Sequence, residues 1–329
     1  MGGRRMSTKR IIAAAGVLFA LTLPLAGVAQ AADTVKMGNI GSANANLWPT
    51  LIAMKKGLYA AEGVGVDIVH VQSSATLVQQ LAAGSLDLTM TTGMVDIIRA
   101  VDKGAPVVLI RIETQSPPYV LVAKAAIKDM KGLKGKTISI GGPKDITRIF
   151  LERMLQPSGL KPDEYDLVFA GSTQARAAAL LGGAVDATII VPPFNFQAEA
   201  AGFNRLGLTV DYAADLPFGA TVANRKWATD NGNVLAKLLS AQQKAIAWFY
   251  DERNKAEAVA ILGAQSSITP GDIEKSYDFY RSGHYYDDTG TVSKRKLGAL
   301  LQVMSDLGDL ADAKALDRFI LPGVTRVSD

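Results

Sequence analysis

The sequence contains no cysteine and only two histidines among its 329 residues. The absence of cysteine excludes disulfide bonds, thiol catalysis and thiolate metal sites, so the hydrophobic core must stabilise the fold. His70 and His284 lie far apart, and neither has the spacing of a metal-binding or catalytic motif around it. We expect both to be structural, and we expect neither a metal nor a cofactor.

The chain also lacks net charge once its first 31 residues are set aside. It carries 35 Lys and Arg against 31 Asp and Glu, and four of the basic residues lie within the first ten positions. The remainder is balanced, and the isoelectric point of about 9.1 reflects the N-terminal segment. The charge therefore gives no support for a nucleic-acid partner.

Residues 1–31 have the pattern of a secretory signal peptide. A basic start precedes an apolar run that is interrupted by Pro24, and Ala29-Gln30-Ala31 forms a cleavage site of small residues. A membrane anchor is the alternative, but the cleavage site and Pro24 favour removal, and no later apolar run approaches spanning length. We expect a periplasmic protein that is not embedded in the membrane. The export route (general or twin-arginine) and the true start (Met1 or Met6) stay open.

Strand and helix patterns alternate through most of the remaining chain. Short apolar runs such as 35–40, 66–71 and 136–141 predict buried strands, and helical spacing follows them, as at 49–63. Repeated β-α-β units predict mostly parallel sheets with helices on both faces. Two extended segments, 114–124 and 219–226, interrupt this order, and the chain from Trp227 onward is mostly helical.

One strand–helix–strand pattern occurs twice in the sequence, at 66–89 and at 165–188. Seven of the 24 aligned positions are identical, and both copies contain L-x-x-G-x-x-D-x-T. The spacing is too long for a solenoid, so the repeat predicts two α/β lobes of like topology. Asp87 and Asp186 are expected to be structural, because each falls where a helix turns into a strand.

Four segments resemble periplasmic solute-binding proteins: IAMKKGLYAAEGVGVDIV, LAAGSLDLT, MKGLKGKTISI and LDRFILPG. The likeness is to the branch that serves importers of taurine, alkanesulfonates, nitrate and thiamine-pyrimidine precursors. It implies a type II periplasmic binding fold, with two α/β lobes, a two-stranded hinge, a monomeric state, and an ABC permease with its ATPase as partners. The first lobe would comprise 32–116 plus 223–329, and the second 117–222.

Ligands of open α/β sheets bind beyond the carboxyl ends of the strands, where this sequence places hydroxyl and amide side chains. Several of these segments are also expected helix starts, which favour anions. Arg148 is the candidate for a charge-assisted bond, and three aromatic residues are candidates to pack an organic body. The candidate ligand-binding residues are Ser42, Asn44, Asn46, Trp48, Ser73, Ser74, Thr91, Thr92, Gln115, Thr147, Arg148, Ser172, Thr173, Pro193, Phe194 and Phe218.

Several of these candidates have structural alternatives. Ser73 and Ser172 are equally suited to cap helices, which does not exclude contact with a ligand. Trp48 is equally suited to the core, and Arg148 to an ion pair with Glu152 one turn on. The sequence leaves these alternatives open.

The composition of the candidate site favours a small organic anion, such as a sulfonate, taurine, nitrate or a carboxylate. A thiamine-pyrimidine precursor is the alternative, but it would need a carboxylate for its ring nitrogens, and the sequence offers no well-placed acid. A ligand-sensing periplasmic protein is a further alternative. We expect no enzymatic activity, because there is no recognisable nucleophile–base pair, metal triad or nucleotide-binding loop.

The first prediction concerns export. If 1–31 are a cleaved signal peptide, the mature protein begins at Ala32. Intact-mass analysis of a periplasmic extract should give the mass of 32–329, whereas a protein that retains 1–31 would contradict the prediction.

Overall fold

The computed structural model describes residues 1–3, 33–41, 44–310, 313 and 316–329. The chain divides into two units, Met1–Ala31 and Ala32–Asp329, and the description below concerns the second. Residues 4–31 of the predicted signal peptide and Ser42 lie outside the described residues. In the described part of the chain, no helix has the length and hydropathy needed to cross a membrane.

The first sheet has five strands in the order β2-β1-β3-β10-β4. β1 pairs in parallel with both β2 and β3, while β10 runs antiparallel to β3 and β4. Side chains of β3 and β4 are buried throughout, as expected for strands that helices cover on both faces. The strands are β1 (Asp33–Ile40), β2 (Val64–Val71), β3 (Leu88–Gly93), β4 (Val107–Thr114) and β10 (Gly219–Asn224).

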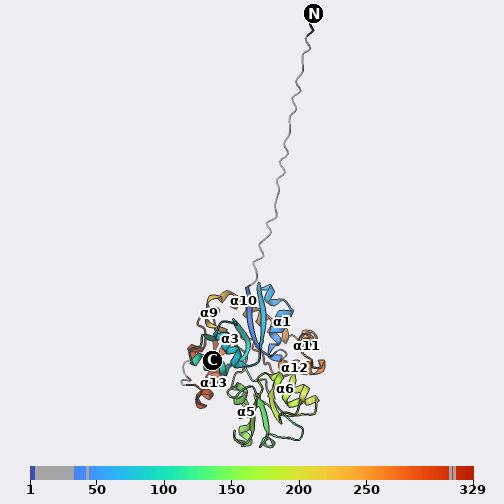
Figure 1. The fold of residues 1–329 in the computed structure, drawn as a ribbon, viewed down its shortest axis with the longest axis vertical. Helices are drawn as coiled ribbons and strands as arrows, with labels where there is room; N and C mark the ends of the chain where they lie inside the picture. Colours follow the sequence, from blue (N-terminus) through green and yellow to red (C-terminus); the bar gives the residue numbers. More distant parts are fainter. Residues whose placement is uncertain (4–32, 42–43, 311–312, 314–315) are drawn as a thin grey trace. The chain divides into compact units, whose positions relative to one another are not determined.

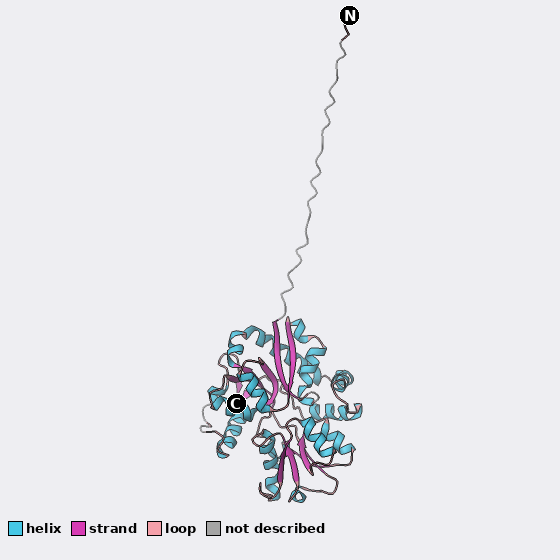
Figure 2. Ribbon diagram, in the orientation of Figure 1, coloured by secondary structure: helices cyan, strands magenta, loops and turns pink. Residues whose placement is uncertain are grey.

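The second sheet also has five strands, in the order β7-β6-β8-β5-β9. β6 pairs in parallel with β7 and β8, and β5 runs antiparallel to β8 and β9. Figure 2 shows the two sheets as separate groups of strands, each flanked by helices. The strands are β5 (Val120–Ala123), β6 (Thr137–Ile140), β7 (Asp166–Phe169), β8 (Ala187–Ile190) and β9 (Asn204–Leu208).

Helices account for most of the remaining chain, and α10 is the longest in Figure 1. The α-helices are α1 (Trp48–Lys55), α2 (Leu58–Ala61), α3 (Ser74–Ala82), α4 (Met94–Asp102), α5 (Ile146–Leu155), α6 (Thr173–Leu181), α7 (Phe194–Ala200), α8 (Val210–Ala213), α9 (Arg225–Asp230), α10 (Gly232–Tyr250), α11 (Lys255–Gly263), α12 (Pro270–Ser282) and α13 (Lys294–Asp306). The shorter elements are the 3-10 helices η1 (Ala45–Leu47), η2 (Met130–Leu133), η3 (Gln156–Ser158), η4 (Glu252–Asn254) and η5 (Leu316–Phe319), with strands β11 (Val292–Ser293) and β12 (Val327–Ser328).

The prediction of two mostly parallel α/β lobes is confirmed. The copies of the repeat are β2-α3-β3 and β7-α6-β8, and they occupy the same positions in the two strand orders. Asp87 Oδ2 accepts a hydrogen bond from the backbone N of Lys36 at 2.8 Å, and Asp186 Oδ2 accepts one from Thr137 N at 3.1 Å. Each aspartate thus ties the repeat to the central parallel strand of its own sheet.

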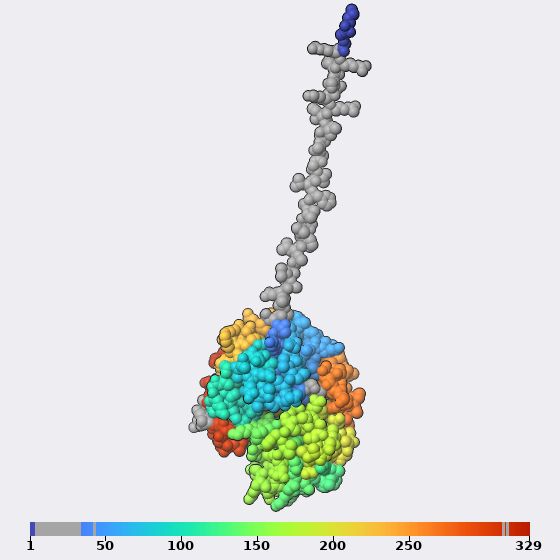
Figure 3. Space-filling view, viewed as in Figure 1, coloured from blue at the N-terminus to red at the C-terminus, as the bar shows by residue number. Residues whose placement is uncertain are grey.

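Two connections join the sheets. The chain passes from β4 to β5 through 115–119 and returns from β9 to β10 through 209–218. The expected lobe boundary at 222 falls inside β10, which belongs to the first sheet. We call the first sheet with its helices the first lobe, and β5–β9 with α5–α8 the second lobe. Figure 3 shows the cyan surface of the first lobe in contact with the green surface of the second.

The helix predicted over 49–63 is divided. α1 ends at Lys55 and α2 begins at Leu58, because Gly57 between them has a φ of +66°, which no right-handed helix contains. The segment after β8 forms α7 from Phe194. Its prolines, Pro192 and Pro193, stand before the helix, where the missing N–H groups interrupt no helical bond.

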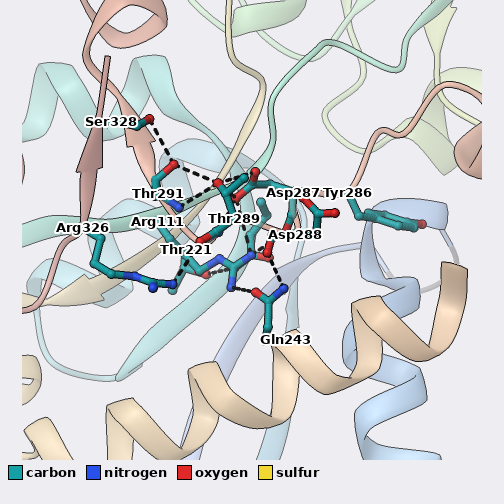
Figure 4. Close-up of polar contacts among 12 residues, drawn as sticks. Arg111, Thr221, Gln243, Tyr286, Asp287, Asp288, Thr289, Thr291, Arg326 and Ser328 are labelled. Carbon is teal, nitrogen blue, oxygen red and sulfur yellow. Dashed lines mark hydrogen bonds and ion pairs between the residues drawn. The ribbon is translucent and has the colours of Figure 1, made fainter.

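A buried ion cluster anchors β4, which leads into the first connection (Figure 4). Arg111 Nε lies 3.1 Å from Glu113 Oε1, and Arg111 Nη2 donates to the carbonyl of Asp287 at 2.7 Å. Gln243 of α10 accepts a hydrogen bond from Arg111 Nη1 at 3.0 Å. Burial raises the pKa of the Glu113 carboxyl, and the charge of Arg111 offsets part of this shift. The cluster holds β4, α10 and the segment before β11 together.

The second prediction concerns this cluster. Arg111→Met leaves the buried Glu113 and Asp287 without a cation, so the free energy of unfolding should fall by about 3–5 kcal/mol at neutral pH. Without the charge of Arg111, the folded-state pKa of the Glu113 carboxyl is raised still further above the unfolded value. The penalty is therefore present at higher pH and shrinks as the pH falls and the folded protein binds protons.

Urea unfolding of Arg111→Met at about pH 7.5 and about pH 5 measures this change. Arg326→Met is the matched control, because Arg326 lies beside the cluster in Figure 4 but is exposed. It should change stability by less than about 0.5 kcal/mol. An Arg111→Met deficit that grew toward low pH would contradict the interpretation.

Candidate functional site

A cavity of about 260 Å³ lies between the two lobes. Four helices begin at its wall: α3 and α4 from the first lobe, and α5 and α6 from the second. Ser73 and Ser172 cap α3 and α6, each accepting a backbone N–H at 3.2 Å, and Asp145 caps α5. Because unpaired N–H groups and helix dipoles favour negative charge, this wall attracts anions or hydrogen-bond acceptors.

Hydroxyl and amide side chains line much of the cavity. Asn44 caps η1 by accepting a hydrogen bond from Asn46 N at 3.0 Å, and Asn46 Oδ1 accepts one from the hydroxyl of Tyr280 at 2.7 Å. Thr91 is 9% exposed, and its hydroxyl makes no hydrogen bond to any described residue. A buried hydroxyl without a partner is costly, so a bound solute that paired with Thr91 would be favoured.

Arg176 places a buried positive charge at the cavity. Its side chain is 2% exposed and donates hydrogen bonds to Ile189 O and Thr173 Oγ1, each at 2.9 Å, and to Gly171 O. No carboxylate of the described residues lies within ion-pair distance of Arg176. The neutral acceptors position the guanidinium group but leave its charge uncompensated, which favours an anionic ligand group nearby.

Two aromatic residues from the inter-lobe connections complete the wall. The rings of Tyr119 and Phe218 meet edge to face, with centroids 5.1 Å apart, and Tyr119 lies over the guanidinium of Arg176 at 5.9 Å. Burial raises the pKa of the Tyr119 hydroxyl above its ordinary value, so it stays a neutral donor. These rings offer an apolar surface to the organic part of a ligand.

Two carboxylates also reach the cavity, Asp96 from α4 and Asp145 from the start of α5. Asp96 Oδ1 accepts a hydrogen bond from Arg99 Nη1 at 2.7 Å. Burial raises the pKa of Asp96, Ser74 and Arg99 offset part of the shift, and the charge of Asp145 adds to it. The cavity thus holds acceptors as well as donors.

Ion pairs connect the lobes beside the cavity. Lys144 of the second lobe binds Asp309 at 2.7 Å, and Asp309 also pairs with Arg99 at 3.0 Å. Arg99 donates a further hydrogen bond to the carbonyl of Lys144. Burial acts to raise the pKa of Asp309, but Lys144 and Arg99 lower it overall, so this carboxylate stays charged.

The structure brings together half of the residues predicted from the sequence. These lining residues are Asn44, Asn46, Ser73, Ser74, Thr91, Ser172, Thr173 and Phe218. Thr147, Thr92 and Gln115 lie close in the sequence to lining segments but are not part of the wall. Thr147 is buried and bonds Asp145, Thr92 is 1% exposed, and the carbonyl of Gln115 accepts a hydrogen bond from Lys296.

Four other predicted residues lie elsewhere. Trp48 is fully buried, donates to Ala258 O at 2.8 Å and packs against Phe249, so it is a core residue. Arg148 pairs with Glu152 at 2.8 Å and lines a neighbouring groove. Pro193 precedes α7, and Phe194 at its start faces a different groove. For Trp48 and Arg148, the structure selects the structural alternatives.

Five polar residues line the cavity but are not among the candidates predicted from the sequence: Asn39, Asp96, Tyr119, Asp145 and Arg176. Asp145 lies just beyond the carboxyl end of the strand predicted at 136–141, so its position offered a signal. Tyr119 directly follows the two prolines of the first connection. Asp96 and Arg176 lie inside helices, and nothing in their spacing indicates which way they face.

The fold is similar to that of solved periplasmic binding proteins. The alkanesulfonate-binding protein SsuA from Xanthomonas axonopodis pv. citri, bound to MOPS, superposes with a TM-score of 0.71. The match covers 90% of this chain and 98% of that one at 18% identity. The predicted two-lobed fold of periplasmic binding proteins is confirmed.

A family model described as NMT1/THI5 like matches residues 44–256, which is more than half of the sequence. The chain therefore belongs to the NMT1/THI5-like family.

Two relatives that are similar in sequence have names that refer to pyrimidines. The formylaminopyrimidine-binding protein of Halalkalibacterium halodurans is 24% identical over 228 residues, which is 67% of each chain. The 4-amino-5-hydroxymethyl-2-methylpyrimidine phosphate synthase of Schizosaccharomyces pombe is 26% identical over 143 residues, 43% of this chain and 40% of the relative.

The third prediction separates Arg176 from Arg148. Arg176→Lys keeps the charge but loses the forked hydrogen bonds, so affinity for the bound solute should fall about ten-fold or more, equivalent to roughly 1.5–3 kcal/mol. Arg148→Lys, the matched control outside the cavity, should change affinity less than about two-fold. Calorimetry with the tightest solute of a thermal-shift screen measures both, and equal effects of the two substitutions would contradict the assignment.

Proposed function

We propose that this chain is the extracytoplasmic substrate-binding component of an ABC-type importer. It captures a small organic solute between its two lobes and delivers the solute to a permease and its ATPase. The observation that carries the proposal is the buried Arg176 without a carboxylate partner among the described residues, in a cavity of about 260 Å³ that both lobes line. Cavities of this kind between lobes are typical solute sites.

A small organic anion with a short apolar part, such as a taurine-like sulfonate or a carboxylate, is the first candidate solute. Arg176 and the starts of α3, α4, α5 and α6 favour an anionic group. Tyr119 and Phe218 suit the organic part. The solved alkanesulfonate-binding protein has a name that agrees with this choice. At 18% identity, however, that similarity supports the fold and not the solute.

A thiamine-pyrimidine precursor is the second candidate, and a specific observation favours it. The sequence offered no well-placed acid for ring and amino nitrogens, but Asp96 and Asp145 both line the cavity beside the aromatic rings. The formylaminopyrimidine-binding relative supports the same reading. The proposed residues of the site are therefore Asn44, Asn46, Ser73, Ser74, Thr91, Asp96, Tyr119, Asp145, Ser172, Thr173, Arg176 and Phe218.

We propose a binding protein and not an enzyme. One relative is named as a synthase, but the match covers 40% of its length. The residues that line the cavity include neither cysteine nor histidine. His70 is exposed on β2, and His284 stacks on Tyr250 with ring centroids 4.4 Å apart. We further propose periplasmic location after removal of residues 1–31.

The fourth prediction tests solute capture. A solute that contacts both lobes favours the state in which the lobes meet, so it should raise the melting temperature and reduce the radius of gyration in solution scattering. The stabilisation should reach about 2.7 kcal/mol at a hundred-fold excess over the dissociation constant. A thermal-shift screen of sulfonates, nitrate, carboxylates and aminopyrimidines identifies the solute. If none of them raised the melting temperature, the proposed function would fail.

A pair of glycine variants tests the contact between the lobes. Gly171 has a φ of +59°, and a Cβ there would lie 2.6 Å from the carbonyl oxygen of Gln72 on the other lobe. Gly183 has a similar φ of +77°, but a Cβ there would meet nothing within 4 Å. Gly171→Ala should weaken solute binding about ten-fold or more, whereas Gly183→Ala should show only the shared backbone cost of about 1 kcal/mol in stability. Equal solute affinity in the two variants would argue against capture by closure.

A further inference from the structure

The cavity brings two carboxylates together from opposite lobes. Asp96 lies in the first turn of α4 in the first lobe, and Asp145 precedes α5 in the second. Both residues line the cavity, and the negative charge of Asp145 contributes to the raised pKa of Asp96. Two partly buried carboxylates that line one cavity repel each other, so a donor that binds both of them is favoured.

Each carboxylate has acceptor capacity left. Asp145 Oδ1 accepts hydrogen bonds from the backbone and hydroxyl of Thr147, whereas Asp145 Oδ2 accepts none from the described residues. Asp96 Oδ1 is bonded to Arg99, and Asp96 Oδ2 accepts no hydrogen bond from the described residues. The buried Thr91 hydroxyl at the same cavity, without a partner among the described residues, is a second and independent sign of a missing polar ligand group.

We infer that the solute carries a protonated amine or an amino N–H group, and that Asp96 and Asp145 accept its hydrogen bonds from the two lobes. The inference rests on the proposed solute-binding function and narrows its substrate class. Charge-assisted bonds to both carboxylates offset their repulsion and hold the lobes together. Nitrate and plain alkanesulfonates lack such a donor, so the class is an amino-substituted solute, an amino-sulfonate or an aminopyrimidine.

The ion pairs beside the cavity give Asp96 its position. Arg99 bonds Asp96, pairs with Asp309, and donates to the carbonyl of Lys144 in the second lobe. Arg99 is therefore fixed by groups of both lobes. The acceptor site is complete only when the lobes meet, which makes Asp96 a specificity-determining residue of the closed state.

The pH dependence follows from the charged groups around Asp96. These are Arg99 on its own helix, Asp145 and Lys144 before α5, and Asp309 after α13, and the neutral Ser74 on α3 acts to lower the pKa of Asp96. Asp96 must be ionised to accept bonds from an amine, and its pKa in the free protein is raised. Affinity for an amino solute should therefore be greatest above that pKa and should fall as the pH decreases through it.

Matched solute pairs test the inference on the full chain. Taurine is compared with isethionate, and 4-amino-5-hydroxymethyl-2-methylpyrimidine with its analogue that has a methyl in place of the amino group. In the pair that binds, the amino member should bind about ten-fold tighter or more, since it alone makes the charged hydrogen bonds. Equal affinities within the pair that binds would overturn the inference and leave the proposed function standing.

Substitutions of the two carboxylates test whether they cause the preference for the amino member of each pair. Asp96→Asn should reduce the preference for the amino member about ten-fold and flatten its pH dependence, as should Asp145→Asn, in which asparagine still caps α5. Asp102→Asn is the control, because Asp102 lies on the same helix α4 but pairs with Arg318 at 2.8 Å. A preference unchanged in both cavity variants would overturn the inference. If no member of either pair binds but another solute of the screen does, the inference fails and the proposed function stands. If no solute of the screen binds, the proposed function itself fails.

Discussion

The structure depends on the direction of its parallel strands. In each lobe a strand ends at the same edge as its neighbours, and the helix that follows begins there, so helix N-termini accumulate at that edge. Two such edges face each other across one cavity, which α3, α4, α5 and α6 reach from both sides. The backbone N–H groups set the preference of the cavity for negative charge, and the side chains modify it. The capping residues Ser73 and Ser172 lie at the cavity wall, where a ligand would contact them.

Two buried arginines show how surroundings decide the role of a charge. Arg111 has Glu113 at 3.1 Å and lies beside Asp287, so its charge is neutralised within the protein and the group holds strands and helices in place. Arg176 bonds carbonyls and a hydroxyl, which orient it without neutralising it. The charge of Arg111 is therefore balanced without a ligand, whereas the charge of Arg176 would be balanced by an anionic ligand.

Much of the fold could be predicted from the sequence, because the signals are local. Alternation of strands and helices, the caps at Ser73 and Ser172, and the repeated aspartates each concern a few neighbouring residues. The site was harder to predict. Trp48 and Arg148 carry suitable chemistry at suitable positions, but distant contacts with Ala258 and a neighbouring contact with Glu152 occupy them. Asp96, Tyr119 and Arg176 face the cavity through tertiary packing, which no local pattern records.

The repeat shows where the two lobes diverge. Four of its seven identical positions have a clear role in the fold: the caps, which also line the cavity, the buried Leu81 and Leu180, the glycines after each helix, and the aspartates that bond the central strands. Leu77 and Arg176 occupy the same place in the two copies. Leu77 is fully buried and packs against Gly38 of β1. A helical side chain leans toward the N-terminus of its helix, so an arginine at this place reaches back over the start of α6, to Thr173 and the carbonyl of Gly171. The same position in the repeat therefore holds a core leucine in the first lobe and the cavity-lining Arg176 in the second.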